Sequence, residues 1–248
     1  MCSKLELRDV SFRFGSFPVL KNVNLAVAPG DVAIVGGRSG CGKSTFLEIC
    51  AALLTPQSGS VLWDDMDISQ VSKYDLYHRR RSVGYVFQVH ALISNHTVFD
   101  NIALPLRSST DQSDSDIRNR VFEQMEELNI SGIDKALPEV LSAAQLKAVA
   151  LARALVKRPR LLLLDEPLSG VDPFTAQSII DVLHNRWKRE NMSIVMISHA
   201  LNAWPEWNAK RLMLNNGLLE TAADHFRVAK ELVKPRKETG LWNTKNVQ

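Results

Sequence analysis

The stretch Gly37-Arg38-Ser39-Gly40-Cys41-Gly42-Lys43-Ser44-Thr45 fits the phosphate-loop (P-loop) pattern G-x-x-x-x-G-K-[S/T] and follows an apolar run at 32–35. An apolar run before a glycine-rich turn predicts a β-strand that leads into a helix. The glycines let backbone N–H groups surround a phosphate chain, and the helix N-terminus adds a partial positive charge. In this pattern Lys43 contacts the β- and γ-phosphates and the Ser44 hydroxyl binds Mg²⁺. The stretch therefore predicts a nucleotide-binding site.

The whole chain has the composition of an ordinary globular protein. Its 248 residues are 45% hydrophobic and 23% charged, with a formal net charge of +3. No apolar run approaches the roughly 18 residues of a membrane-spanning helix, and the first residues carry no signal-peptide core. Cys2, Cys41 and Cys50 form no metal-binding spacing, as expected in a reducing compartment. We expect a cytosolic protein with no nucleic-acid partner, whose densest basic run, 79–81, is a solvated face.

Apolar patterns and turn residues predict an α/β fold. Residues 5–25 alternate in the manner of two hairpin strands around Gly15 and Pro18. Fully apolar runs are typical of central parallel strands covered on both faces, and they occur at 32–35, 83–87, 161–164 and 194–197. Apolar residues recur at helical spacing in 45–54, 117–128 and 141–155. We therefore expect a P-loop core with a mainly parallel sheet, an N-terminal antiparallel β subdomain and an inserted helical subdomain.

Polar groups follow each of the four apolar strands: the P-loop, Gln88, Asp165-Glu166 and His199. Because ligands bind at the carboxyl ends of strands in an open parallel sheet, these groups should converge on a triphosphate. Asp165 suits the Mg²⁺ side, since a buried carboxylate is stable only beside a cation. Glu166 can orient an attacking water or accept its proton. His199 can hold Glu166 and contact the γ-phosphate, and Gln88 can complete the shell around Mg²⁺.

Structural roles are the alternative for the same residues. A histidine after a strand is usually a hydrogen-bonded structural residue, and an Asp-Glu pair is often a helix cap. The order of the motifs along the chain, with the P-loop first, favours the functional reading of Asp165, Glu166 and His199.

With these residues in view, the sequence resembles the ATP-binding cassette (ABC) ATPase family over essentially its whole length. The resemblance assigns Gly37–Thr45 to the Walker A loop, Gln88 to the Q-loop, 141–145 to the signature motif, 161–166 to the Walker B strand with catalytic Glu166, 169–172 to the D-loop, His199 to the switch histidine and Phe14 to the adenine-stacking aromatic. By default an isolated aromatic such as Phe14 is a core residue. The family implies ATP and Mg²⁺ as cofactors.

The resemblance also implies partners and a place in the cell. ABC ATPases work as head-to-tail dimers, in which Ser142 and Ala144 of one subunit would contact the ATP held by the other. They power integral membrane permease subunits from the cytoplasmic face of the inner membrane, to which they bind peripherally, and an accessory protein is a further expected partner. A closer likeness of 76–106 and 168–173 to the Mce/Mla type favours lipid or another envelope component as cargo. The alternative is a non-transport ATPase that acts as an ATP-gated mechanical or scaffolding partner of a membrane protein, as in the cell-division or lipoprotein-release type.

These assignments divide the chain into four segments. We expect a nucleotide-binding core at 1–88, the helical subdomain with the signature motif at 89–158, the rest of the core at 159–222 and a basic C-terminal tail at 223–248. The tail can lie on anionic lipid, reach a neighbouring subunit or be solvated.

The signature motif departs from the family pattern Leu-Ser-Gly-Gly-Gln, because Ala143 and Ala144 replace both glycines. An added methyl group can crowd the partner's γ-phosphate, and a left-handed backbone at either position would cost alanine about 1 kcal/mol. A homodimer would then be a slow or regulated ATPase, whereas a heterodimer would pair this signature with a degraded site. We favour the homodimer, the commoner arrangement. Ala200 also departs from the family, and Trp204 and Trp207 have no explanation in the sequence.

Overall fold

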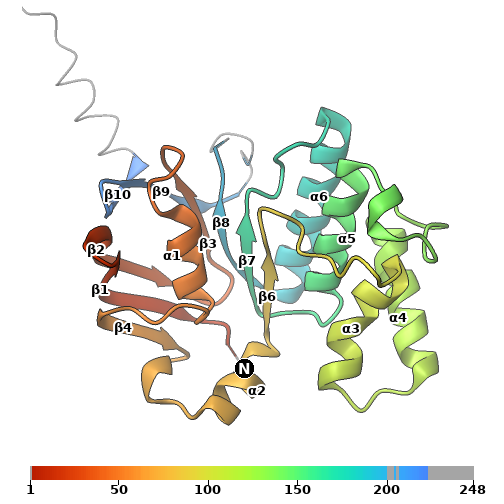
Figure 1. The fold of residues 1–248 in the computed structure, drawn as a ribbon, viewed down its shortest axis with the longest axis horizontal. Coiled ribbons are helices and arrows are strands. Elements are labelled where there is room, and N and C mark those ends of the chain that lie inside the picture. The colour runs from red at the N-terminus through yellow and green to blue at the C-terminus, as the bar shows by residue number, and fades with distance from the viewer. Residues whose placement is uncertain (1, 200–203, 205–206, 223–248) are drawn as a thin grey trace, which may run out of the picture.

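The computed structural model describes residues 2–199, 204 and 207–222, and it contains two sheets (Figure 1). The larger sheet runs in the order β10 (Leu218–Thr221), β9 (Ala209–Asn215), β3 (Val32–Gly36), β8 (Ser193–Ile197), β7 (Leu161–Asp165) and β6 (Val83–Val86). All of its neighbouring strands are parallel except β9 and β10. No helix among the described residues is long and apolar enough to cross a membrane.

The smaller sheet is antiparallel and precedes or flanks the P-loop in sequence. Its order is β2 (Phe17–Val27), β1 (Leu5–Phe14), β4 (Ser58–Trp63) and β5 (Met66–Asp67). β1 and β2 form the expected hairpin, and Gly15 adopts a φ of 57° in its turn. Leu5 and Leu7 point from β1 into the core, as the alternation of the sequence predicts. A register shift between Leu7 and Val10 places Val10 in the core as well. The α/β fold with an antiparallel subdomain is thus confirmed.

The central strands owe their apolar character to two separate cores. Every residue of β3, β7 and β8 is buried. Successive side chains point to opposite faces, so Val32 and Ile34 join one hydrophobic cluster while Ala33 and Val35 join the other. The first cluster lies against the helices between β6 and β8, and the second lies against α1 (Lys43–Cys50) and the antiparallel sheet.

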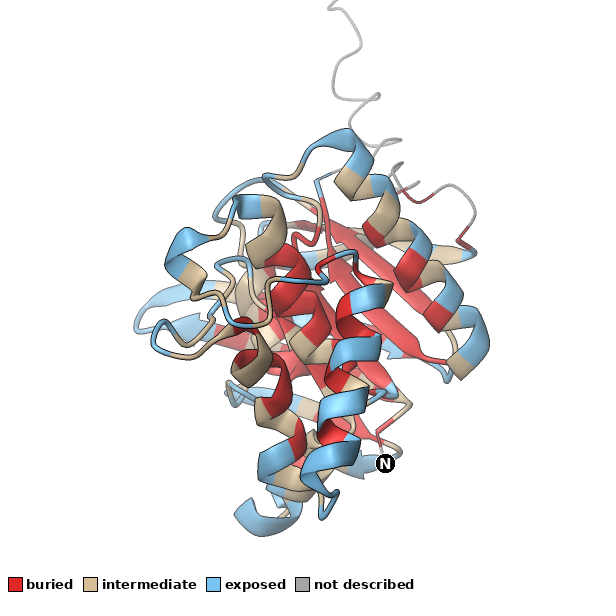
Figure 2. Ribbon diagram, turned by 90° about the vertical axis from the view of Figure 1, so that its right-hand side faces the viewer, coloured by how far each residue is buried: buried red, intermediate tan, exposed pale blue. Residues whose placement is uncertain are grey.

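The helical subdomain is formed by α3 (Val98–Ser109), α4 (Asp114–Glu127) and α5 (Ala143–Leu155), which lie between β6 and β7 in sequence. With α6 (Pro173–Glu190) they cover one side of the larger sheet, and Figure 2 shows their buried residues as stripes on the inner faces. Two short 3-10 helices, η1 (Ile68–Gln70) and η2 (Pro138–Val140), and α2 (Lys73–Arg80) complete the described elements. The exact domain boundaries stay predictions.

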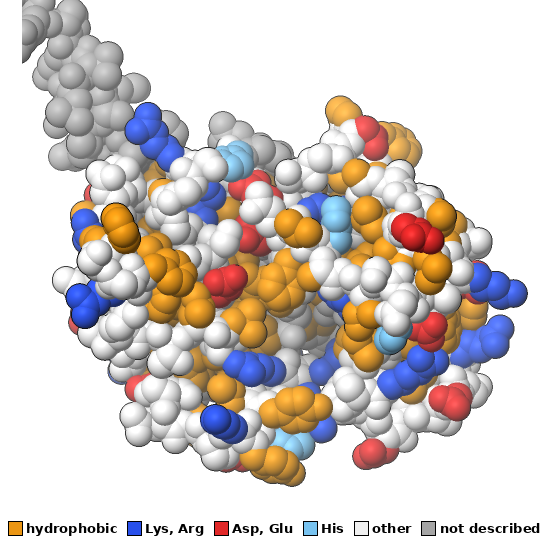
Figure 3. All heavy atoms as spheres, viewed as in Figure 1, with side chains coloured by type: hydrophobic (Ala, Val, Ile, Leu, Met, Phe, Trp, Pro, Cys, Tyr) orange, Lys and Arg blue, Asp and Glu red, His pale blue; other side chains and the backbone are white. Residues whose placement is uncertain are grey.

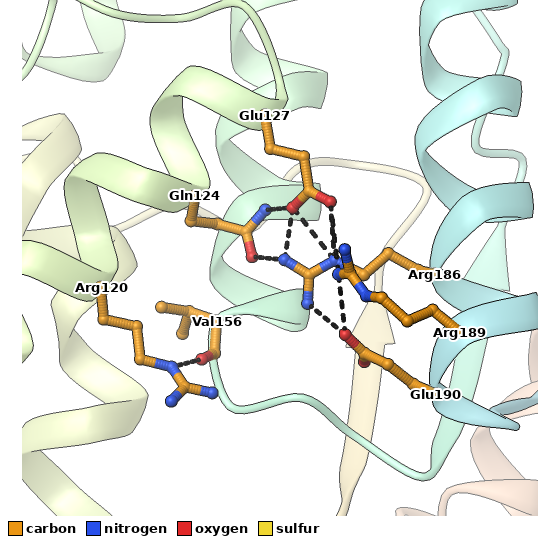
Figure 4. A network of polar contacts seen from close by, with 7 residues as sticks. All are labelled: Arg120, Gln124, Glu127, Val156, Arg186, Arg189 and Glu190. Carbon is orange, nitrogen blue, oxygen red and sulfur yellow. Dashed lines mark hydrogen bonds and ion pairs between the residues drawn. The ribbon is translucent and has the colours of Figure 1, made fainter.

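An arginine joins the helical subdomain to α6 (Figure 4). Arg186 on α6 donates from Nε to Glu127 on α4 at 2.9 Å, and it also forms an ion pair with that carboxylate. Two further donors of the same guanidinium reach Gln124 at 2.7 Å and Glu190 at 3.1 Å. Nearby, Arg120 donates to the carbonyl of Val156 at 2.7 Å. These bonds fix α4 against α6 and the end of α5.

Trp204 and Trp207 prove to be core residues. Both are buried in the first hydrophobic cluster. The rings of Trp187 and Trp207 are stacked, with centroids 5.4 Å apart, and Trp204 meets Trp207 edge-on. Trp187 also donates from its indole to the carbonyl of Gly30 at 2.6 Å. Ala200 and the basic tail at 223–248 lie outside the described residues.

Candidate nucleotide-binding site

A cavity of about 230 Å³ lies at the carboxyl ends of the central strands. The P-loop residues at 39–40 and 42–45 line it, together with Gln88, Asp165, Glu166 and His199. The structure therefore brings together the polar groups that follow β3, β6, β7 and β8, as the sequence predicts.

Helix α1 offers its first turn to this cavity. Ser72, Thr97, Ser113, Ser142 and Asp172 cap the other described α-helices with side-chain hydrogen bonds. The N-cap of α1 is Gly42, which supplies no side chain. A capping side chain would accept hydrogen bonds from the first N–H groups of the helix. Because α1 has no such side chain, its first N–H groups are available to an anion.

Two glycines of the P-loop are required by its geometry. Gly37 has a φ of 150° and Gly42 a φ of 101°. A Cβ on Gly42 would collide with Val19, and one on Gly37 would meet the carbonyl of Leu214 and the sulfur of Cys41. Cys41 is thus a small residue packed inside the loop, and the loop can approach a phosphate closely.

The side chain of Lys43 is held in place by backbone carbonyl groups of the P-loop. Its Nζ donates to the carbonyl oxygens of Gly37 and Arg38, each at 2.9 Å. The side chain is buried, and Lys43 is one of the residues that line the cavity. The group is therefore positioned to contact a phosphate chain that lies along the loop.

The residues expected around Mg²⁺ are neighbours in this cavity. Asp165 is 4% exposed, and burial raises the pKa of its carboxyl, although a hydrogen bond from Ser44 and the charges of Lys43 and Lys147 oppose the rise. Ser44 offers a hydroxyl oxygen to this cavity, Asp165 offers carboxylate oxygens and Gln88 offers its amide oxygen, so all three can act as oxygen ligands. The described residues contain no group of three or more His, Cys, Asp or Glu suited to a metal. One carboxylate with other oxygens fits Mg²⁺, which is usually completed by phosphates and water.

Glu166 and His199 form a pair beside Asp165. The Nε2 atom of His199 lies 3.1 Å from Oε1 of Glu166, and the backbone N–H of His199 points to Oε2 at 3.4 Å. Burial raises the pKa of Glu166, whereas the charges of His199 and Lys43 lower it and Asp165 raises it further. Glu166 also has a φ of 50°, an unfavourable backbone for glutamate. Such a strained, buried carboxylate is typical of a reactive site.

Residues 20–169 match the protein family described as ABC transporter. The chain belongs to the ABC transporter family. It is 35% identical over 219 residues to the sulfate/thiosulfate import ATP-binding protein CysA of Pectobacterium atrosepticum, which covers 87% of this chain and 65% of CysA. It is 32% identical to the intermembrane phospholipid transport system ATP-binding protein MlaF of Haemophilus influenzae, over 79% of this chain and 74% of MlaF. The chain spans less than two thirds of several relatives, for example 58% of a spermidine/putrescine import ATP-binding protein PotA of Nitrosomonas europaea.

A solved structure supports the same family assignment. The ATP-binding cassette MJ0796, a dimer in a post-hydrolysis state bound to ADP and Pi, superposes with a TM-score of 0.81 at 29% identity. The match covers 88% of this chain and 98% of MJ0796.

Lys147 is a residue near the site of this ABC transporter protein that the sequence interpretation missed. It is 2% exposed on α5, and its Nζ donates to the carbonyl of Glu166 at 3.2 Å and to that of Gln88 at 3.4 Å. Burial lowers its pKa, and the charges of Asp165 and Glu166 oppose that change. The available signal was a lysine inside the apolar face of a helix, between Leu146 and Ala148. It joins the signature helix to the ends of β6 and β7.

The remaining predicted residues lie apart from this cavity. Phe14 is 53% exposed at the end of β1, where its ring meets Phe12 edge-on. Ser142 caps α5 through a capping box with Gln145. Ala144 borders a different cavity, beside Phe174 of α6.

The backbone strain that the two alanines of the signature motif could have caused is absent, because both residues are helical. Ala143 and Ala144 are the first two residues of α5, and neither adopts a positive φ. Alanine therefore has no conformational penalty here, and only the volume of its methyl group distinguishes it from the glycine usual in the ABC transporter family.

Proposed function

We propose that this chain is the ATP-binding and ATP-hydrolysing subunit of an ABC transporter. The observation that carries the proposal is the single cavity in which the P-loop, Gln88, Asp165, Glu166 and His199 meet. The chain has no described membrane-spanning helix, and its relatives are named as ATP-binding proteins of import and transport systems. It would therefore bind peripherally to integral membrane permease subunits at the cytoplasmic face of the inner membrane. The transport names of the relatives disfavour a non-transport scaffolding role.

The residues of the cavity divide the binding of ATP between them. The N–H groups of the P-loop and the first turn of α1 would surround the phosphates, and Lys43 would neutralise their charge. Phe14 has an exposed ring that can stack on adenine. Ser44, Asp165 and Gln88 would hold Mg²⁺, which supplies charge neutralisation at the β- and γ-phosphates.

Glu166 would act on the water that attacks the γ-phosphate. Its buried carboxylate can orient that water and take its proton, because a raised pKa makes it a better base near neutral pH. His199 would fix the carboxylate through the 3.1 Å contact and remain exposed toward the γ-phosphate. These roles give each group one task in phosphoryl transfer to water.

A second ATPase subunit would complete the site. Ser142 and Ala144 do not line the cavity of their own chain, so in this proposal they close over the ATP of a partner. The dimer of MJ0796 supports such an assembly. We favour a homodimer, with an accessory protein as a further partner. For the cargo we propose a lipid or another envelope component, in line with the MlaF relative, although the CysA relative matches at similar identity.

The test is the change Glu166→Gln in the full chain. Loss of the base should lower ATP turnover by about 100-fold or more, while ATP binding persists. ATP that is bound but not hydrolysed should hold two chains together. The solution mass measured by light scattering with Mg-ATP should therefore double. The control, Glu126→Gln, makes the same change on an exposed part of α4 and should leave both quantities unchanged. Unchanged turnover in Glu166→Gln would overturn the proposed role, and a persistent monomer would favour a heterodimer.

A further inference from the structure

A second cavity lies at the opposite end of β6 and β7 from the nucleotide site. It has a volume of about 550 Å³ and is lined by five cationic side chains and one acidic one: Arg79, Arg81, Lys157, Arg158, Arg160 and Asp75. We call it the basic cavity. Since Ser82 and Arg160 directly precede β6 and β7, the length of these strands separates it from the P-loop by about 15 Å. Figure 3 shows a hollow between the two halves of the molecule with Lys and Arg side chains on both sides.

The backbone around the basic cavity is firmly held. Arg160 donates its N–H to the carbonyl of Ser82 at 2.9 Å, and the Ser82 hydroxyl donates to the carbonyl of Arg79 at 2.8 Å. Next to them Gly84 packs so closely that a Cβ would lie 2.8 Å from the carbonyl of Ala154. The walls are therefore preorganised, and no rearrangement is needed to gather the cations.

Among the described residues, these five cations share the lining of the cavity with a single carboxylate, Asp75. In the part of the chain that the structure describes, none of the five forms an ion pair. Asp75 instead accepts a hydrogen bond from the hydroxyl of Ser72 at 2.7 Å. The contrast is Arg186, whose charge is matched by Glu127 and Glu190. The basic cavity therefore keeps a net positive charge.

Two of the cations are held at a cost. Burial and the nearby charge of Arg81 lower the pKa of Lys157 to about 8. Arg158 has a φ of 52°, a backbone that glycine adopts far more easily. Arg79 and Arg81 are half-buried, so the solvated face expected at 79–81 is only partly correct. An anion in the cavity would offset the repulsion between Lys157 and Arg81.

We propose that the basic cavity binds a phosphate group, carried either by a free anion or by an anionic lipid headgroup. Guanidinium groups form paired hydrogen bonds with phosphate oxygens, and a lysine ammonium adds a compact charge. A phosphate carries enough charge to interact with several of these five cations at once. The open mouth of the cavity, at the exposed Arg158 and Arg160, admits either source.

Titration calorimetry with inorganic phosphate tests the site in the full chain. The P-loop is first filled with Mg²⁺ and a non-hydrolysable ATP analogue, so that phosphate cannot bind there. Wild type should bind phosphate at one site, and Lys157→Gln/Arg160→Gln should bind it about tenfold more weakly or worse, because charged hydrogen bonds are lost. The control Lys188→Gln removes an exposed lysine of α6 outside the cavity and should bind as wild type does. No binding by wild type, or equal binding by the double variant, would overturn the proposal.

The variant Arg158→Gly separates loss of phosphate binding from loss of stability. Glycine suits the left-handed backbone, so this variant should melt at a higher temperature than wild type while binding phosphate more weakly. A merely structural role of Arg158 would not separate these two effects. Unchanged phosphate affinity in this variant, together with unchanged affinity in Arg160→Gln, would refute the site.

Vesicles distinguish the two sources of phosphate. Wild type and Lys157→Gln/Arg160→Gln are sedimented with phosphatidylcholine vesicles, with or without phosphatidylglycerol. Sedimentation that needs phosphatidylglycerol, is lost in the double variant and is inhibited by inorganic phosphate identifies a headgroup. Calorimetric binding without sedimentation identifies a free anion. Absence of both overturns the proposal.

Discussion

At the scale of the residue, one buried lysine fixes the position of two groups in the site. Lys147 donates to the carbonyls of Glu166 and Gln88, so Lys147→Met leaves both oxygens without this donor. We expect ATP turnover to fall by roughly 10- to 100-fold, because small displacements of reacting groups have effects of this order. The affinity for ATP should change much less, since Lys147 does not line the cavity. Steady-state kinetics beside the exposed control Lys135→Met checks this, and equal turnover in both variants would contradict it.

Burial of the Asp165 carboxylate lowers the stability of the fold at neutral pH, although the proposed Mg²⁺ site needs this group. Burial raises the pKa of Asp165 above its unfolded value, so the folded state favours the protonated form. The associated stability is present below the ordinary pKa and is lost as pH rises through the raised one. Asp165→Asn should therefore raise the melting temperature of the nucleotide-free chain at pH 7, by roughly 2–4 °C for each kcal/mol gained. The gain should vanish below the ordinary carboxyl pKa, and Asp111→Asn should show no gain. A lower melting temperature at pH 7 would refute this account.

At the scale of the element, the attachment of α4 to α6 depends on one guanidinium. Burial pushes the pKa of Glu127 upward, but the hydrogen bonds and charge of Arg186 outweigh it and hold the pKa below its ordinary value. Arg186→Met removes the main partner of this carboxylate, which keeps only the amide of Gln124 at 2.9 Å and the more distant Arg189 at 3.9 Å. The change should cost about 3 kcal/mol of unfolding free energy. Arg189→Met removes a mostly exposed arginine of the same helix and should cost less than about 1 kcal/mol.

Urea unfolding of both variants measures these costs. The double variant Arg186→Met/Glu127→Leu should recover most of the loss, because no unpaired charge remains. Equal midpoints for Arg186→Met and Arg189→Met would show that the network in Figure 4 does not hold the helices. The Glu127 contribution should also diminish as pH falls through its lowered pKa.

The elements that the sequence predicts well are those determined by local pattern. The apolar runs before the P-loop, Glu166 and His199 are buried strands because both faces are covered, and their polar ends meet by topology alone. Lys147 and Trp204 escaped prediction because their roles depend on contacts between distant segments. The backbone at Ala144 is a different case, because the capping box of Ser142 and Gln145 is a local pattern that starts a helix there. Only the glycines usual in the family had raised the question of a left-handed backbone at this position.

At the scale of the whole molecule, Ser142 and Ala144 at the start of the signature helix do not line the nucleotide cavity of their own chain. In the proposed dimer these two residues would therefore act on the ATP of a second subunit. Because Ala144 is helical, only its methyl group would distinguish it from glycine at the partner's γ-phosphate in the proposed dimer. Ala144→Gly should therefore raise ATP turnover several-fold in a homodimer, where both sites gain space. The same change near the start of α5 should cost less than about 1 kcal/mol of stability. Turnover measured across chain concentration checks this, since a homodimer also requires specific activity to rise with concentration. If turnover per chain is unaffected by the change and constant across concentration, neither the methyl group nor self-association limits hydrolysis, and a heterodimer becomes the better assembly.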